Sequence, residues 1–179
     1  MTKDQNFLKS YYPDDVLKKA EQIELLAFDV DGVLTDGGLY YDHEGNELKK
    51  FFAQGGHGIK IVQSIGIEIM IISGRRAACV DHRAEELGIK YVIQGSRDKL
   101  KSFHDQNISI SLEKVCFVGD DTVDVEILNN VGMSVVVPNT NPTIDIKQFD
   151  WVTKRHGGYG AIRDVCDLIY FSKSLIDIV

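Results

Sequence analysis

Residues 25–36 read LLAFDVDGVLTD, an apolar stretch that ends in two carboxylates, Asp29 and Asp31. Side chains alternate along a strand, so two acids spaced one residue apart share a face as the chain leaves the strand. Like charges this close repel each other, and a fold keeps them where a cation or a shared proton offsets the repulsion. Ligands of an open parallel sheet bind at the strand ends. We therefore expect a binding site here; the simpler alternative is a pair of solvated loop acids.

Further apolar segments alternate with helical patterns along the chain. Residues 67–72 and 115–118 are near-continuous apolar runs, typical of strands buried on both faces. Such alternation with short links predicts a parallel sheet covered by helices. The expected fold class is therefore α/β, a Rossmann-like doubly wound parallel sheet with helices on both faces. The other expected strands are residues 89–93 and 133–137, and the expected helices are centred in residues 14–23, 59–65, 76–87, 98–100 and 125–131.

Two segments stand outside this alternation. Residues 38–53 predict a small β-hairpin inserted after the first strand, and the glycine-rich residues 54–58 predict a flexible junction. Residues 158–179 predict a C-terminal helix and tail with few polar positions. We expect this helix to be covered on more than one side, either by its own sheet or by another subunit. Because no repeat or linker interrupts the pattern, we expect one domain over residues 1–179.

The net charge of the chain is −7, and 44% of its residues are apolar. This charge argues against a nucleic-acid partner, because such binding needs a basic surface. It is compatible with a phosphorylated substrate, because a divalent metal can supply local positive charge. The 3 cysteines are odd in number and lie in apolar patterns, and no stretch has the length of a membrane span. We therefore expect a cytoplasmic protein without a membrane partner.

Chemically useful side chains follow four of the expected strands, at the edge where ligands bind. A serine after a strand is usually a helix cap, and a lysine on a helix is usually solvated surface. Their common edge, rather than any single residue, indicates one site. In strand order these residues are Asp29 and Asp31, then Ser73, then Lys99, and finally Asp120, Asp121 and Asp124.

Phosphoryl transfer accounts for this set of side chains. Asp29 would act as the nucleophile and form an aspartyl-phosphate, and Asp31 would protonate the leaving oxygen and later take a proton from water. The carboxylates of Asp29 and Asp120, with the main-chain carbonyl of Asp31, would supply oxygen ligands to Mg²⁺. Ser73 offers a hydroxyl group and Lys99 a cation to the phosphoryl group. Without a metal, this many acids against one lysine would make a poor phosphate site.

The two remaining acids have two interpretations. Asp121 or Asp124 could orient Lys99 or the waters around the metal. Both could instead cap the helix that begins there, where a carboxylate favours the positive end of the helix. The sequence leaves both alternatives open.

Residues 28–36 match the pattern Asp-x-Asp-Gly-x-x-x-Asp and resemble the first motif of the haloacid dehalogenase-like phosphatases. Capped members carry a large insertion after the first or second motif. Here residues 37–72 and 74–98 are taken up by the hairpin and the sheet elements, so no cap domain fits. Over residues 15–172 the chain is similar to the capless 3-deoxy-D-manno-octulosonate 8-phosphate phosphatases. The segments that carry this likeness are residues 28–36, 56–60, 73–75, 81–83, 94–95, 99, 119–121 and 157–163.

This resemblance implies a Mg²⁺-dependent hydrolase that forms a homotetramer and releases phosphate from a sugar acid made for lipopolysaccharide. It also implies that the C-terminal tail of one subunit reaches toward the site of a neighbour. The expected partner is therefore a small sugar-acid phosphate.

Basic side chains near the motifs are expected to bind this substrate. Arg75 and Arg83 are candidates for its carboxylate, since guanidinium groups grip carboxylates in a bidentate way. Lys60, which we also assign to substrate binding, stands where the subgroup usually has an arginine, and Gln54-Gly55 stands where a basic residue and Asp are common. These departures keep a nine-carbon ulosonate phosphate open as an alternative substrate.

Two interpretations from other functional classes compete with an enzyme. A receiver-type signalling domain is also doubly wound and has acids and a lysine, but its acids lie on different strands from those seen here. A binding module without catalysis is the second alternative. The presence of every catalytic part, Ser73 and Lys99 included, favours the phosphatase.

Overall fold

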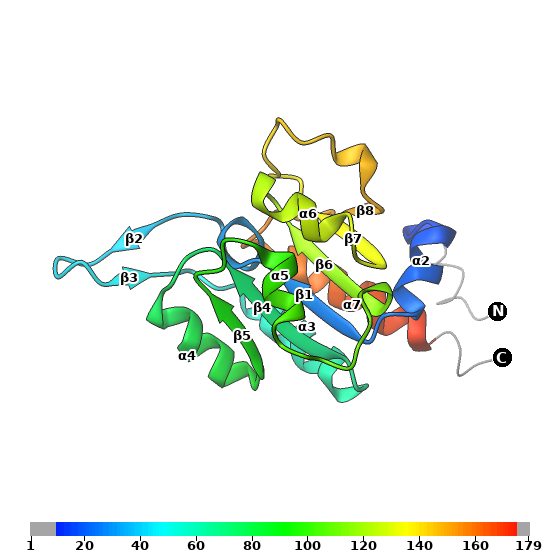
Figure 1. The fold of residues 1–179 in the computed structure, drawn as a ribbon, viewed down its shortest axis with the longest axis horizontal. Helices are drawn as coiled ribbons and strands as arrows, with labels where there is room; N and C mark the ends of the chain where they lie inside the picture. Colours follow the sequence, from blue (N-terminus) through cyan, green and yellow to red (C-terminus); the bar gives the residue numbers. More distant parts are fainter. Residues whose placement is uncertain (1–9, 175–179) are drawn as a thin grey trace.

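The computed structural model describes residues 10–174, which contain a six-stranded parallel sheet in the order β5-β4-β1-β6-β7-β8 (Figure 1). β1 lies inside the sheet because its residues are all apolar and buried, and it pairs with β4 on one side and β6 on the other. The predicted fold class is confirmed. The strands are Leu25–Phe28 (β1), Glu68–Ser73 (β4), Tyr91–Gln94 (β5), Val115–Gly119 (β6), Met133–Val136 (β7) and Trp151–Val152 (β8).

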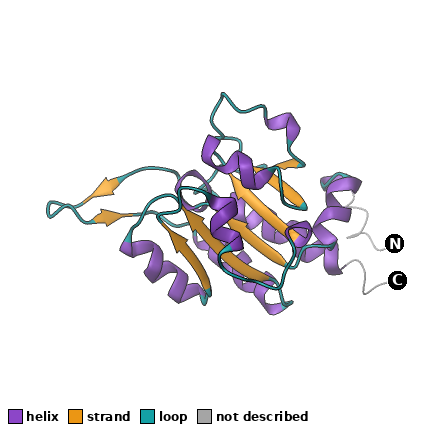
Figure 2. Ribbon diagram, in the orientation of Figure 1, coloured by secondary structure: helices purple, strands orange, loops and turns teal. Residues whose placement is uncertain are grey.

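Helices cover both faces of the sheet (Figure 2). Alternate side chains of a strand point to opposite faces, so Leu26 and Phe28 enter one apolar core and Leu25 and Ala27 enter the other. The first core takes buried side chains from α2, α3, α4 and α7, and the second from α5 and α6. The helices are Asp14–Glu21 (α2), Ala53–Ser64 (α3), Ala78–Leu87 (α4), Lys99–His104 (α5), Val125–Leu128 (α6) and Ala161–Ser174 (α7), with short helical turns at Val30–Leu34 (η1), Leu112–Lys114 (η2), Thr122–Asp124 (η3) and Ile146–Gln148 (η4).

The predicted hairpin is a pair of short antiparallel strands, Tyr40–Tyr41 (β2) and Glu47–Leu48 (β3), which projects away from the sheet (Figure 1). The rest of the segment between β1 and β4 is taken up by η1 and α3, and α4 fills the segment between β4 and β5. No cap domain is present in the described part of the chain, as predicted.

The flexible junction predicted over residues 54–58 is wrong, because α3 begins at Ala53 and includes these residues. Glycine in a helix interior costs about 1 kcal/mol relative to alanine, but packing requires it here. A Cβ at Gly56 would lie 3.2 Å from Cδ2 of Leu87 in α4, and one at Gly58 would lie 3.0 Å from Cβ of Cys166 in α7. The glycines therefore let α3 approach α4 and α7 closely.

The C-terminal helix α7 is covered by its own chain. Val165, Leu168 and Ile169 are fully buried in the core shared with α2, α3 and the sheet. Of the two alternatives expected from the sequence, its own sheet and another subunit, the first therefore accounts for the burial of these side chains. The tail after residue 174, for which a contact with a neighbour is expected, lies outside the described residues.

The sixth strand, β8, was missed by the sequence analysis because its two apolar residues are too short a run to indicate a strand. It extends the sheet beside β7, where Val135 pairs with Trp151. Among residues 10–174, no helix is long and apolar enough to cross a membrane.

Candidate active site

The chain turns sharply where it leaves β1. The Asp29 N–H donates to the carbonyl of Val118 (3.0 Å), and Oδ1 of Asp29 accepts from the N–H of Val30 (2.6 Å). Gly32 then adopts a φ of +86°, and a Cβ there would lie 2.0 Å from Oδ2 of Asp120. This turn therefore needs glycine both for its backbone angle and for the approach of the acid that follows β6.

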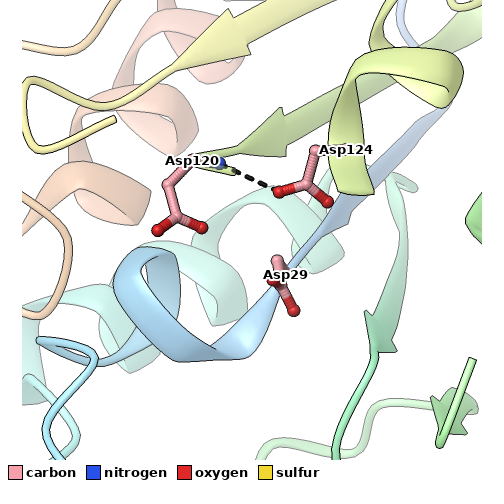
Figure 3. Close-up of side chains that lie close together, drawn as sticks. All are labelled: Asp29, Asp120 and Asp124. Carbon is pink, nitrogen blue, oxygen red and sulfur yellow. Dashed lines mark hydrogen bonds between the residues drawn. The ribbon is translucent and has the colours of Figure 1, made fainter. Parts of the chain in front are cut away.

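Three carboxylates gather at this edge of the sheet (Figure 3). Asp29, Asp120 and Asp124 each offer an oxygen, and these oxygens lie within 4.8 Å of one another. Asp124 is fully buried, and its Oδ2 accepts from the N–H groups of Asp120 (3.0 Å) and Asp121 (3.2 Å). A Cβ at Gly119 would lie 2.6 Å from Cβ of Asp124, so the strand must end in glycine. These contacts fix the acids from β6 beside the acid from β1.

Lys99 is the cation of this group. It opens α5 after the N-cap Asp98, whose Oδ1 accepts from the N–H of Lys101 (2.8 Å). Nζ of Lys99 lies 2.9 Å from Oδ2 of Asp29 and also binds Oδ1 of Asp124, with 2% of the side chain exposed. Burial alone would lower the pKa of Lys99, but the two carboxylates raise it above its usual value. Lys99 therefore stays charged behind Asp29, and it is not among the side chains that line the pocket described below.

The carboxylates also perturb one another. Burial raises the pKa of Asp29 to about 6 and that of Asp120 to about 8, while Lys99 opposes both shifts. Oδ1 of Asp120 is buried and has no hydrogen-bond partner among the described residues. A divalent cation would satisfy this oxygen and offset the repulsion. The donors fit Mg²⁺ held by Asp29 and Asp120, since both line the pocket described below, whereas Asp124 is fully buried and does not line it.

A pocket of about 180 Å³ opens above these acids. Ser73 ends β4 in its wall, and its Oγ accepts from the N–H of Arg75 (3.3 Å), which leaves the hydroxyl proton free to donate. The wall thus combines acids, a hydroxyl donor and a guanidinium group. The lining residues are Asp29, Asp31, Ser73, Gly74, Arg75, Asp120, Asp121 and Val123.

Asp31 lines the same pocket but does not join the three carboxylates. Its Oδ1 binds Nζ of Lys49, and its Oδ2 lies 3.5 Å from Nε of Arg75. Glu47 completes the group, with its two carboxylate oxygens 2.6 Å from Nζ of Lys49 and 2.9 Å from Nη2 of Arg75. The sequence analysis missed Glu47 and Lys49, although their spacing in the returning strand of the hairpin places both on one face.

Asp124 fits both interpretations of these two acids, and Asp121 fits the capping one. Asp124 positions Lys99 and also accepts from the backbone at the start of η3. Oδ1 of Asp121 accepts from the N–H of Thr122 (2.7 Å) and from Nδ2 of Asn141 (2.9 Å), so this acid caps the turn while lining the pocket.

Lys60 and Arg83, predicted to bind substrate, lie outside this pocket. Nζ of Lys60 donates to the carbonyl of Leu87 (2.7 Å) in a separate hollow beside Glu68, at the opposite end of β4 from Ser73. Lys60 lies in α3, in agreement with the helix expected over residues 59–65, and its side chain lines that hollow instead of the pocket.

Arg83 packs between α3, α4 and the chain after the hairpin. Its Nη1 lies 2.7 Å from Oε2 of Glu86, and its guanidinium carbon lies 5.6 Å from the ring centroid of Phe51. Of the two arginines predicted to bind the substrate, Arg75 therefore lines the pocket and Arg83 does not.

Comparisons of this chain with family models and with known proteins agree on one family. Residues 99–162 match the haloacid dehalogenase-like hydrolase family. The 3-deoxy-D-manno-octulosonate 8-phosphate phosphatase of Escherichia coli is 43% identical over 165 residues, which are 91% of this chain and 87% of that protein.

Two solved structures extend the likeness to three dimensions. The phosphatase of the same name from Yersinia pestis superposes with a TM-score of 0.87 at 39% identity, covering 92% of this chain and 89% of that one. The one from Moraxella catarrhalis, in complex with magnesium, phosphate and a KDO molecule, has a TM-score of 0.87 at 38% identity, covering 93% and 97%. This chain therefore belongs to the 3-deoxy-D-manno-octulosonate 8-phosphate phosphatase family of haloacid dehalogenase-like hydrolases.

Proposed function

We propose that this chain is a Mg²⁺-dependent phosphatase that hydrolyses 3-deoxy-D-manno-octulosonate 8-phosphate in the synthesis of a lipopolysaccharide precursor. One observation carries the proposal: the acids around a single pocket are divided. Asp29 and Asp120 lie together beside a buried oxygen without a partner, whereas Asp31 is held apart by cations. A nucleophile and a separate acid/base residue need this division. The Moraxella catarrhalis complex supports the choice of metal and substrate.

In the first step, a carboxylate oxygen of Asp29 attacks phosphorus as the bond from phosphorus to the sugar oxygen breaks. Asp31 gives its proton to the departing oxygen, so the sugar acid leaves as an alcohol and Asp29 carries the phosphoryl group. The Ser73 hydroxyl donates to a phosphoryl oxygen, and Lys99 holds Asp29 through the 2.9 Å contact. Magnesium, when bound by Asp29, Asp120 and the Asp31 carbonyl, offsets the negative charge of the acids and the phosphoryl group.

In the second step, Asp31 takes a proton from a water molecule whose oxygen attacks phosphorus. The bond between Asp29 and phosphorus breaks, phosphate leaves, and both acids return to their starting states. The base must be a residue other than the nucleophile, because the carboxyl group of Asp29 is phosphorylated at this stage.

Arg75 is the residue that we assign to the carboxylate of the substrate. It lines the pocket, and 44% of its side chain is exposed. Glu47 occupies only part of its guanidinium group, which has five N–H donors and can bind a second carboxylate.

We further propose that residues 1–179 form one phosphatase domain, which works as a cytoplasmic homotetramer. Apolar side chains on the projecting hairpin support association: Tyr40 and Leu48, which pair across the two strands, are 46% and 52% exposed. A cluster of exposed apolar groups marks an interaction surface. A stable monomer in light scattering at micromolar concentration would contradict the tetramer.

Phosphate release tests the proposed function. The substrates are 3-deoxy-D-manno-octulosonate 8-phosphate and a nine-carbon ulosonate 9-phosphate, each with Mg²⁺ and with EDTA. We expect the eight-carbon substrate to react faster, EDTA to stop the reaction, and Asp29→Asn to abolish it. Asp42→Asn is the matched control, because the hydrogen bonds of the Asp42 carboxylate are accepted from Glu44 and Asn46, within the turn of the hairpin. Turnover in Asp29→Asn would refute the assignment of Asp29 as the nucleophile. Faster release of phosphate from the nine-carbon substrate would refute the proposed eight-carbon substrate.

A further inference from the structure

We infer that Lys49 is a positioning residue, which fixes one oxygen of the Asp31 carboxylate so that the other serves the leaving group. The inference rests on the function proposed above. Nζ of Lys49 binds Oδ1 of Asp31 and lies 2.6 Å from Oε1 of Glu47, and only 1% of its side chain is exposed. Lysine is rarely buried this fully unless it is paired. Both partners of Lys49 are acids, and one of them is the proposed acid/base residue.

The two oxygens of Asp31 are in different situations. Oδ1 accepts from Lys49, whereas Oδ2 is buried and has no hydrogen-bond partner among residues 10–174. Nε of Arg75, at 3.5 Å, is too far from Oδ2 for a good hydrogen bond. A buried acceptor without a partner is costly, so a site that keeps one has a group to bind there. In the proposed mechanism Oδ2 carries the proton of Asp31, and the departing oxygen of the substrate is the acceptor to which it donates.

The hairpin determines where Lys49 lies. Tyr41 pairs with Glu47 in the antiparallel ladder, and Lys49 follows directly after β3 with its Nζ on Oε1 of Glu47. Glu47 in turn binds Nη2 of Arg75 (2.9 Å) at the end of β4. Lys49 thus links the turn after β1 to the base of the hairpin. The competing explanation is that these contacts only attach the hairpin to the sheet.

Leaving groups that differ in their need for a proton separate the two roles. A sugar alkoxide needs a proton as it departs, but 2,4-dinitrophenolate leaves without one. We expect Lys49→Met to lower kcat/KM for 3-deoxy-D-manno-octulosonate 8-phosphate by about 100-fold, the scale of general acid catalysis, and for 2,4-dinitrophenyl phosphate by less than about threefold. The ratio kcat/KM is the right quantity, because it ends at leaving-group departure and excludes hydrolysis of the phosphorylated enzyme.

Two further variants complete the experiment. Lys49→Arg keeps the charge and should recover part of the loss on the sugar substrate. Lys50→Met is the matched control, because Lys50 binds Asp36 (2.8 Å) and lies over the ring of Tyr159, with 47% of its side chain exposed. It should change neither rate.

The outcomes distinguish the inference from the function on which it rests. Equal losses on both phosphate esters, or no loss on either, would overturn the positioning role of Lys49. A wild-type protein that releases phosphate from neither ester would overturn the proposed function whatever Lys49 does. A loss confined to the sugar substrate, partly recovered by Lys49→Arg, supports both.

Discussion

Two groups of charged side chains meet at the pocket; one has an excess of negative charge and the other is neutral. The first, which we call the sheet cluster, has three carboxylates and one lysine, whereas the second, the hairpin cluster, has two carboxylates and two cations. The first needs an added cation to be stable as a charged group, and the second is balanced by itself. The sheet cluster consists of Asp29, Lys99, Asp120 and Asp124, and the hairpin cluster of Asp31, Glu47, Lys49 and Arg75.

This difference separates the two halves of the chemistry. In the mechanism proposed above, metal binding and the nucleophile belong to the cluster with excess negative charge, and proton transfer belongs to the balanced one. Asp29 and Asp31 are neighbours in the motif, but their partners come from different elements: α5 for Asp29 and the hairpin for Asp31. Changes in one cluster should therefore leave the function of the other largely intact.

The largest effect is expected from removing the cation of the sheet cluster. Lys99→Met leaves the buried carboxylates of Asp29 and Asp124 without their shared partner. We expect the free energy of unfolding, measured with urea in EDTA, to fall by about 3–5 kcal/mol, and turnover to fall by about 10²–10³-fold. Lys101→Met is the control, because its contact with Asp105 is exposed. Full activity in Lys99→Met would show that Asp29 needs no support from α5.

Magnesium should distinguish the clusters without any assay of turnover. At a concentration about 100 times its Kd, Mg²⁺ should raise the free energy of unfolding of the wild-type protein by about 3 kcal/mol. The shift should vanish in Asp120→Asn, whose buried Oδ1 has no partner, and persist in Asp31→Asn, whose side chain pairs with Lys49. Thermal or urea unfolding with and without the metal measures it. Loss of the shift in Asp31→Asn would mean that the clusters are not separate.

The sequence predicts the sheet cluster better than the hairpin cluster, and the reason is physical. Strand order alone brings Asp29, Lys99 and Asp120 to one edge, because all strands of the sheet are parallel. Lys49 meets Asp31 only because the hairpin folds back over the motif, a tertiary contact without a local signal. Residues 54–58 were predicted as a flexible junction because glycine favours loops by propensity, whereas these residues lie inside α3, where glycine permits close packing.

The third prediction concerns the loop that carries both Asp29 and Asp31. A Cβ at Gly157 would lie 1.7 Å from the carbonyl oxygen of Gly32, whereas one at Gly55 would be 3.9 Å from its nearest neighbour, Cβ of Ile162. Gly157→Ala should therefore lower the free energy of unfolding by about 1–3 kcal/mol. It should weaken the Mg²⁺ shift and slow turnover together, because the loop serves both clusters. Gly55→Ala, in a helix, should leave stability unchanged or raise it by about 1 kcal/mol. An undisturbed Mg²⁺ shift in Gly157→Ala would show that the loop is not their common support.

The smallest effect is expected at Glu47, where one charge of the balanced cluster can be removed without removing an acceptor. Glu47→Gln keeps an oxygen for Lys49 but changes the cluster from neutral to positive, while Arg75 loses its ion pair. A positive pocket attracts an anionic substrate more strongly, so KM should fall about two- to threefold at low salt, and added salt should reduce this difference. The value of kcat and the Mg²⁺ shift should stay near those of the wild type. Initial rates at two salt concentrations measure KM and kcat, and unfolding with and without the metal measures the Mg²⁺ shift. A higher KM would mean instead that Glu47 is needed to orient Arg75, and that the balance of the hairpin cluster serves geometry rather than charge.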